Sequence, residues 1–205
     1  MKIYTKAGDT GLTFLARSRK KLPKNHPVFC LLGSLDVFNS VLGCCKAYLL
    51  ETAPFKDKDL VAEALTALQN AVFAIGAEIN LGSKKCSNKI SSSQIEVMEK
   101  LIDYLDAKSP PLRNFILPSD SIPVSMLHLA RGLCRQAERD LIRTKTHFSI
   151  RNELVIFLNR ASDMLFVISR FVGNQLGVAE KIWTSERSFR SFEKLKQQLK
   201  ALNEI

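Results

Sequence analysis

The chain has few cysteines, prolines and glycines. The cysteine pattern excludes whole classes of protein, and the low proline and glycine content favours a regular fold. The 205 residues include five cysteines, an odd number, and no two of them have CxxC spacing. This argues against a disulfide framework and a zinc knuckle, and it favours a reducing compartment. We expect each thiol to be a small side chain of the core. Seven prolines and nine glycines fit a compact, mostly regular fold.

Long apolar runs and targeting signals are also missing. No stretch approaches eighteen consecutive apolar residues, and the first residues, MKIYTKAGD, form neither an apolar signal core nor an Arg-rich leader. We therefore expect a cytoplasmic protein without membrane contact. A content of 46% hydrophobic and 24% charged residues is that of a globular chain, and 205 residues suit one domain with a sizeable core.

Basic residues exceed acidic ones, and the net charge is +10. Such a charge favours an anionic partner, which can be a nucleic acid, a membrane surface or a polyphosphate. It is equally consistent with a solvated basic surface. Aromatic residues are scarce among the basic ones and no nucleic-acid-binding module is recognisable, so we expect no nucleic-acid partner.

The chain does have apolar residues at three- and four-residue spacing over several long stretches, with no competing run of alternating β-branched residues. The expected helices cover residues 32–50, 58–81, 91–107, 121–148 and 151–177, and a charged tail at 185–205 resembles a final helix. The predicted fold class is all-α, a five-helix antiparallel bundle with an N-terminal, glycine-containing loop arm. We expect residues 1–205 to form one domain, with the arm at 1–30, the bundle at 31–183 and a helical tail at 184–205.

The segment YTKAGDTGLT at residues 4–13 combines two glycines with many hydrogen-bond donors. No apolar period runs through it, so we expect it to form neither a helix nor a strand. It is predicted to stay outside the core as a flexible loop.

A stripe of polar residues lies in the fourth expected helix, in LHLARGLCRQAERDL. His128, Arg131, Arg135 and Glu138 have the spacing i, i+3, i+7 and i+10, which places them on one narrow face of a helix. Two arginines four residues apart can bind phosphate oxygens through bidentate hydrogen bonds. Glu138 can orient Arg135 or hold a metal ion. The alternative is an ordinary surface with Arg–Glu pairs, each contributing about 0.2–0.5 kcal/mol.

A second polar pair lies in the fifth expected helix, RNELVIFLNRASDMLFVISRF. Asn159 and Asp163 are four residues apart, so they face the same way from an otherwise apolar helix. Polar side chains in such surroundings need partners. Either they form an interhelical hydrogen-bond network, or they recognise a ribose or a base.

Taken together, these segments resemble the PduO-type ATP:cob(I)alamin adenosyltransferase family. YTKAGDTGLT resembles its N-terminal loop TKxGDxGxT, and LGSLDVFNS at 32–40 resembles its YGxVDELNS segment. FILP followed by MLHLARGLCRQAER, within 115–139, matches the stretch that ends in LHxARxxxRxAER. FLNRASDMLFVISR at 157–170 is similar to YLNRLSDxLFxxAR, and GVAEKIW at 177–183 to GxxExxW. The five segments occur in the family's order over nearly the whole chain.

The resemblance implies a five-helix bundle assembled as a homotrimer, with active sites between neighbouring subunits. It also implies transfer of the 5′-deoxyadenosyl group of ATP to the cobalt of cob(I)alamin, which gives adenosylcobalamin and triphosphate. Cob(I)alamin is itself a strong nucleophile, so the protein needs no Ser–His or Cys–His nucleophile. The implied ligands are ATP, Mg²⁺ and the corrinoid, and a reductase and an adenosylcobalamin-dependent enzyme are further expected partners.

Residue by residue, the resemblance assigns ATP to the loop, to a later lysine and to the polar stripe. The implied ATP-binding residues are Thr5, Lys6, Gly8, Asp9, Gly11, Thr13, Lys24, Arg131, Arg135, Glu138 and Asn159. Mg²⁺ is expected on the ATP phosphates, with Glu138 as a candidate ligand. Arg131 and Arg135 are the implied catalytic residues, with Asp36, which pairs with Arg131 across a subunit interface. Phe115 is implied to lie beneath the corrin and displace the lower axial ligand, and Asp163 is assigned to the corrinoid.

Two departures from the family pattern affect the site. Residues 117–120 read LPSD where the family usually has LPGG, so two glycines that allow close backbone approach are lost, and Asp120 adds a negative charge. Val37 replaces the acidic residue that usually follows Asp36. These changes leave open the alternative of a non-catalytic relative that binds ATP or a corrinoid as a carrier or sensor.

Overall fold

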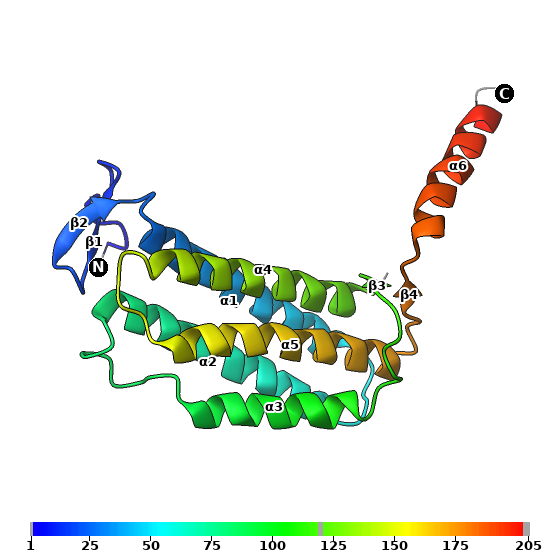
Figure 1. The fold of residues 1–205 in the computed structure, drawn as a ribbon, viewed down its shortest axis with the longest axis horizontal. Coiled ribbons are helices and arrows are strands. Elements are labelled where there is room, and N and C mark those ends of the chain that lie inside the picture. Colours follow the sequence, from blue (N-terminus) through cyan, green and yellow to red (C-terminus); the bar gives the residue numbers. More distant parts are fainter. Residues whose placement is uncertain (1, 119–120, 203–205) are drawn as a thin grey trace.

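The computed structural model describes residues 2–118 and 121–202, and these are mostly helical, as the apolar spacing predicts (Figure 1). The helices are α1 (Pro27–Glu51), α2 (Lys58–Leu81), α3 (Ser92–Asp106), α4 (Ile122–Thr144), α5 (Asn152–Gln175) and α6 (Ser185–Leu202). The strands are β1 (Leu12–Leu15), β2 (Lys20–Pro23), β3 (Ile116–Leu117) and β4 (Lys181–Ile182). The end of the expected tail helix, residues 203–205, lies outside the described residues.

The first helix begins at Pro27 and not at Leu32. A proline suits the first turn of a helix because its missing N–H has no intrahelical partner there. The preceding His26 caps the helix by accepting a hydrogen bond from the N–H of Val28 at 3.3 Å. From Val28 onward the buried residues continue at helical spacing through Leu31, so the core-facing side starts one turn earlier than expected.

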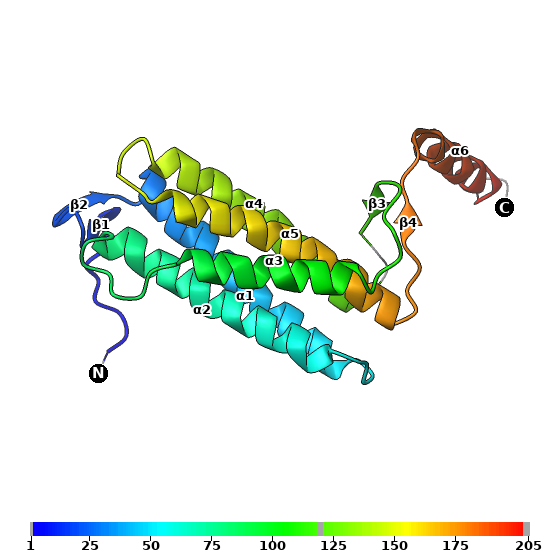
Figure 2. The ribbon, with the colours of Figure 1, turned by 60° about the horizontal axis from the view of Figure 1, so that its bottom comes forward.

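Helices α1 to α5 lie side by side and share one apolar core (Figures 1 and 2). α1 packs against α2 and α4, while α5 packs against α4 and α3. By length and composition alone, α1 and α2 are apolar enough to cross a membrane. Both also place apolar side chains in the shared core, among them Phe38 of α1 and Ile75 of α2, which are fully buried.

The N-terminal arm contains a hairpin that the sequence did not predict. β1 and β2 pair antiparallel, with Leu12 opposite Pro23 and Leu15 opposite Lys20. Thr13 therefore lies in a strand, and the prediction that residues 4–13 contain no strand is wrong at their end. The apolar residue that anchors the hairpin, Leu15, is fully buried and lies two residues beyond the segment 4–13, so the segment itself contains no anchor for a strand.

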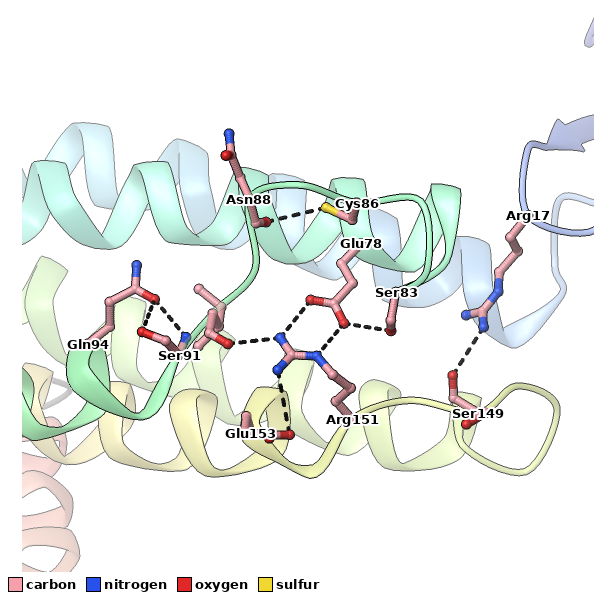
Figure 3. A network of polar contacts seen from close by, with 11 residues as sticks. Arg17, Glu78, Ser83, Cys86, Asn88, Ser91, Gln94, Ser149, Arg151 and Glu153 are labelled. Carbon is pink, nitrogen blue, oxygen red and sulfur yellow. Dashed lines mark hydrogen bonds and ion pairs between the residues drawn. The ribbon is translucent and has the colours of Figure 1, made fainter.

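Polar contacts dock this hairpin on the end of α2 and on the connection between α4 and α5, and Figure 3 shows the contact from Arg17 to Ser149. Asn80, at the end of α2, accepts hydrogen bonds from the N–H of Ala16 at 3.3 Å and the N–H of Arg17 at 2.7 Å. The Arg17 side chain donates to the carbonyl of Ser149 at 3.1 Å and lies over the Phe148 ring. Burial lowers the pKa of Arg17, and its attraction to nearby Glu78 opposes that shift.

A buried ion pair joins the start of α5 to the end of α2 (Figure 3). Arg151 donates from Nε and Nη2 to the two carboxylate oxygens of Glu78 at 2.7 and 2.9 Å, and from Nη2 to the carbonyl of Ile90 at 2.8 Å. Glu78 is only 2% exposed. Burial alone raises the pKa of this carboxyl, but the hydrogen bonds from Arg151 and Ser83 outweigh it and hold the pKa below its usual value.

The opposite end of the helices carries the short β3–β4 pairing. Ile116 lies opposite Ile182 and Leu117 opposite Lys181, in antiparallel register. Strands of two residues have too few positions for an alternating pattern, so the sequence could not predict them. Beyond β4, helix α6 extends away from the other helices (Figures 1 and 2).

The five cysteines are free thiols. Cys45, Cys86 and Cys134 are buried, as expected, whereas Cys30 and Cys44 are exposed, so the prediction of core positions is wrong for these two. Burial raises the pKa of Cys45 to about 12, which keeps this thiol protonated and unreactive.

Candidate functional site

The polar stripe of α4 packs along α5, and three of its residues each contact a residue of α5. His128 approaches Ser169 at 3.4 Å, Arg131 lies over the ring of Phe166, and Glu138 accepts a hydrogen bond from Asn159. From His128 to Glu138 the contacts advance ten residues along α4, and from Ser169 to Asn159 they go back ten residues along α5. This is the pattern of two antiparallel helices. We call this line of contacts the α4/α5 seam. Its members are His128, Arg131, Arg135 and Glu138 on α4, with Asn159, Phe166 and Ser169 on α5.

Two of the predicted site residues meet at one end of the seam. The Nδ2 atom of Asn159 donates to Oε1 of Glu138 at 3.3 Å. Glu138 is half-buried and Asn159 is exposed, so both side chains keep polar atoms available to a ligand. The hydrogen bond also favours the interhelical network that the sequence left as one interpretation of Asn159.

The two predicted catalytic arginines lie further along the seam. The guanidinium of the half-buried Arg131 is 5.3 Å from the centre of the Phe166 ring, a cation–π contact that orients it. Arg135 is exposed, one turn closer to Glu138. The sequence analysis missed Phe166, although it stands seven residues after Asn159 and therefore on the same helical face.

His128 continues the seam toward the β3–β4 end. Burial is the main cause that lowers its pKa, and the positive charge of Arg131 lowers it further, against a smaller effect of Glu180. The imidazole is therefore favoured in its neutral form, able to share a hydrogen bond with the Ser169 hydroxyl.

Asp163 is on the same side of α5 as Asn159 but has a surface partner. Its carboxylate pairs with Arg160 at 3.0 Å, and Arg160 also pairs with Glu99 of α3 at 3.0 Å. The side chain of Asp163 is 50% exposed. This geometry is that of a solvated ion pair, so the assignment of Asp163 to the corrinoid stays a prediction.

The N-terminal loop and Lys24 lie against each other, and their assignment to ATP stays a prediction. Lys6 and Gly11 have positive φ angles of 58° and 76°, and the turns are closed by hydrogen bonds from Asp9 N to Lys6 O at 3.3 Å and from Gly11 N to Gly8 O at 3.2 Å. The backbone N–H of Lys24 donates to the Gly11 carbonyl at 2.9 Å.

The Lys24 ammonium rests directly against the loop. A Cβ added to Gly8 would come within 3.2 Å of its Nζ, so a side chain there would crowd the lysine. Thr5 and Asp9, on the same loop as Gly8, are exposed. Backbone donors and a cation are thus gathered on one exposed turn, which suits an anion.

Thr13 and Asp36 line a shared hollow of about 550 Å³ between the hairpin, α1 and α2. Asp36 is exposed there, whereas Arg131 faces α5 on α4, and no ion pair between them occurs in the described part of the chain. Within one chain the predicted partners are therefore not brought together. Their pairing stays a prediction.

Phe115 lies at the β3–β4 end of the molecule. Its side chain is 79% exposed and lines a shallow hollow of about 510 Å³ with Leu112 and Trp183. The Trp183 N–H donates to the Phe115 carbonyl at 2.8 Å. Of the altered LPSD segment, Ser119 and Asp120 lie outside the described residues.

The arm with β1 and β2 lies at the opposite end of the helices from β3, the strand that directly follows Phe115 (Figure 1). Between them runs α4, whose 23 residues extend about 35 Å at a rise of about 1.5 Å per residue. One chain therefore presents the loop and the exposed aromatic at opposite ends, and a single site that uses both needs more than one copy of the chain.

The residues present fit Mg²⁺ only together with a phosphate ligand. No group of three or more His, Cys, Asp or Glu side chains able to hold a metal occurs within residues 2–118 and 121–202. Glu138 contributes one carboxylate. One carboxylate with phosphate oxygens and water is a usual ligand set of Mg²⁺ in nucleotide sites.

Comparisons with known proteins agree in pointing to one family. Residues 3–172 match the family model described as cobalamin adenosyltransferase. A corrinoid adenosyltransferase of Bacillus subtilis (strain 168) is 33% identical over 180 residues, which cover 88% of this chain and 91% of that protein. Corrinoid adenosyltransferase PduO of Citrobacter freundii is 35% identical over 173 residues, 83% of this chain, which spans about half of that relative (49%).

A solved structure shares the fold. It is a variant PduO-type ATP:corrinoid adenosyltransferase from Lactobacillus reuteri, complexed with cobalamin and ATP. Its TM-score is 0.79 at 26% identity, over 90% of this chain and 97% of that one.

Proposed function

Because the chain belongs to the cobalamin adenosyltransferase family, we propose that it transfers the 5′-deoxyadenosyl group of ATP to cob(I)alamin. The cobalt supplies the electron pair for the new Co–C5′ bond, the C5′–O bond breaks, and triphosphate leaves with that bonding pair. The products are adenosylcobalamin and triphosphate. The observation that carries this proposal is the α4/α5 seam, where Arg131 and Arg135 stand in one line with the hydrogen-bonded Glu138 and Asn159.

The seam suits the nucleotide half of this reaction. Charge builds up on the triphosphate as it leaves, and arginines placed along it stabilise that charge in the transition state. We assign Arg131 and Arg135 to this role. Asn159 has a free amide edge for the ribose or base, and its contact with Glu138 holds the two side chains in a fixed relation.

The N-terminal loop suits the phosphate oxygens that Arg131 and Arg135 do not bind. Its residues, Thr5, Lys6, Gly8, Asp9, Gly11 and Thr13, together with Lys24, offer backbone N–H groups, hydroxyls and ammonium groups. Such a cluster binds phosphate oxygens without needing a deep cavity. Mg²⁺, when bound, neutralises part of the phosphate charge, with Glu138 as its protein ligand.

We place the corrinoid against Phe115, with Asp163 as a further contact. An aromatic ring beneath the corrin excludes the lower axial ligand, and a cobalt without that ligand is easier to reduce from Co(II) to Co(I). The exposure of Phe115 supports this role, since the residue is 79% exposed and its ring is open to contact with another molecule.

We further propose a homotrimer with sites between subunits, because one chain holds the N-terminal loop and the β3–β4 end that carries Phe115 at opposite ends of its helices. In this assembly Asp36 of one subunit pairs with Arg131 of the next. Each subunit is one domain, a five-helix antiparallel bundle of α1 to α5 with the arm and α6 as extensions. We place the protein in the cytoplasm, where a reductase supplies Co(I) and an adenosylcobalamin-dependent enzyme receives the product.

The test is to mix the protein with Mg·ATP and chemically reduced cobalamin and to record the absorption spectrum before and after illumination. A light-sensitive Co–C product formed over many turnovers is expected. Binding of ATP or corrinoid without that product under saturating conditions would instead identify a non-catalytic carrier or sensor.

A further inference from the structure

Arg170, near the end of α5, joins its own end of the chain to residues 106–110, which are about sixty positions away in sequence, and to Glu180 just beyond the helix. Its side chain is 2% exposed. Nε donates to Glu180 at 2.7 Å, Nη1 to Asp106 at 3.3 Å, and Nη2 to the carbonyl of Pro110 at 2.5 Å. The partners belong to the segment before β4, to the end of α3, and to the connection between α3 and β3.

This set of contacts requires an arginine. The guanidinium is planar and points its N–H groups in fixed, divergent directions, so one side chain can bind three partners on different sides. Lysine has a single donor nitrogen on a flexible stem and cannot reach all three. The two carboxylates, Asp106 and Glu180, neutralise the buried positive charge.

The three partners bracket the segment that carries Phe115. Pro110 precedes Phe115 on the same connection, and Glu180 directly precedes β4. β4 pairs with β3, which directly follows Phe115, and the Trp183 N–H donates to the Phe115 carbonyl at 2.8 Å. Since 79% of the Phe115 side chain is exposed, packing does little to hold it. Its position therefore depends on the backbone that Arg170 ties down.

We propose that Arg170 is a positioning residue that fixes Phe115 at the lower face of the corrinoid. By holding Glu180, Asp106 and Pro110 together, it sets the fraction of bound cob(II)alamin that has lost its lower axial ligand. This inference rests on the proposed role of Phe115, and the experiment separates the two.

The experiment uses the full chain with Mg·ATP and cob(II)alamin, and it measures the ratio of four- to five-coordinate Co(II) by electron paramagnetic resonance. Arg170→Lys keeps the charge but loses the divergent donors. We expect the ratio to fall about tenfold, the scale of a lost hydrogen bond between charged groups. The KM for ATP should stay within about twofold, because the seam contacts are untouched.

Two variants of Glu180 give a second test. Its side chain is one-third exposed, so the fold tolerates substitution there more easily than at the buried Arg170. Glu180→Ala should lower the ratio as Arg170→Lys does. Glu180→Gln keeps an oxygen that accepts from Arg170 Nε and should restore most of it. Equal ratios in both Glu180 variants and the unmodified protein would overturn the positioning role.

Arg151→Lys is the matched control, since it weakens a comparable buried ion pair at the far end of α5, with Glu78 (Figure 3). It should lower stability and leave the ratio unchanged. A fall as large as that of Arg170→Lys would mean general loosening and would overturn the inference.

Phe115→Ala separates the two proposals. If it removes four-coordinate Co(II) while Arg170→Lys does not, only the positioning role fails. If Phe115→Ala itself leaves the ratio unchanged, the proposed lower-face role of Phe115 fails.

Discussion

Asn159 donates a hydrogen bond to Glu138 at 3.3 Å and so ties α5 to the polar stripe of α4. At the other end of the same stripe, His128 approaches Ser169 at 3.4 Å. Between these two contacts lie Arg131 and Arg135. The seam therefore has fixed ends and two cations between them, an arrangement suited to an elongated anionic ligand such as a nucleoside triphosphate.

Arg135→Ala should reduce kcat/KM by about 10²- to 10³-fold, because a charged contact made to the leaving triphosphate in the transition state is lost. Steady-state formation of adenosylcobalamin measures this. Arg139→Ala is the matched control, an exposed arginine one turn further along α4 that donates to Gln136. Equal losses in both variants would remove Arg135 from the site.

Mixing two inactive variants should restore activity if sites form between subunits. One variant carries Lys6→Ala in the loop and the other carries Arg135→Ala in the seam. After unfolding and joint refolding in equal amounts, about a quarter of the sites combine an intact loop with an intact seam, so about a quarter of the activity should return. Activity that stays at the level of the separate variants would place loop and seam in the same subunit.

Arg151→Ala should lower the free energy of unfolding by about 3–5 kcal/mol, since it leaves the carboxylate of Glu78 buried without its partner. Urea unfolding at neutral pH measures this loss. Arg160→Ala, which breaks only surface pairs with Asp163 and Glu99, should cost about 0–1 kcal/mol. Similar losses for both would show that the Glu78 site relaxes or admits water.

Stability should fall as the pH is lowered from about 8 to about 5, in part because of His128. Its folded-state pKa lies below the ordinary value of 6.5. The unfolded chain therefore binds the proton more readily, so the contribution is present above pH 6.5 and is lost as the pH falls through the folded-state pKa.

His128→Gln should reduce this slope, measured as the free energy of unfolding in urea at each pH. His26, whose pKa is also lowered, accounts for part of the remainder. Glu78 and Asp57 act at lower pH, because their folded-state pKa values lie below 4.5 and 3.8. An unchanged slope in His128→Gln would show that this imidazole is not held neutral.

The sequence was sufficient to predict the helical layout because helix periodicity is local. The stripe from His128 to Glu138 follows from spacing alone, and so does the common face of Asn159 and Asp163. Spacing alone does not predict which residues of α4 face which residues of α5, because this depends on the offset between the two helices. This is why the contacts of Arg131 with Phe166 and of Glu138 with Asn159 appear only in the structure.

The β elements and the Arg170 contacts show the same limit. The two-residue strands β3 and β4 carry no pattern of their own, and their pairing brings together residues more than sixty positions apart. In the sequence, Arg170 is only the last residue of the segment FLNRASDMLFVISR, and nothing there indicates its partners. Its three partners are assembled by chain topology, which no local period encodes.

The stoichiometry of triphosphate release tests adenosyl transfer most directly. With ATP and excess cob(I)alamin, ion chromatography should find one intact triphosphate for each adenosylcobalamin formed, and Arg135→Ala should lose both products together. Release of ADP and phosphate, or consumption of ATP without a Co–C bond, would contradict the proposed reaction.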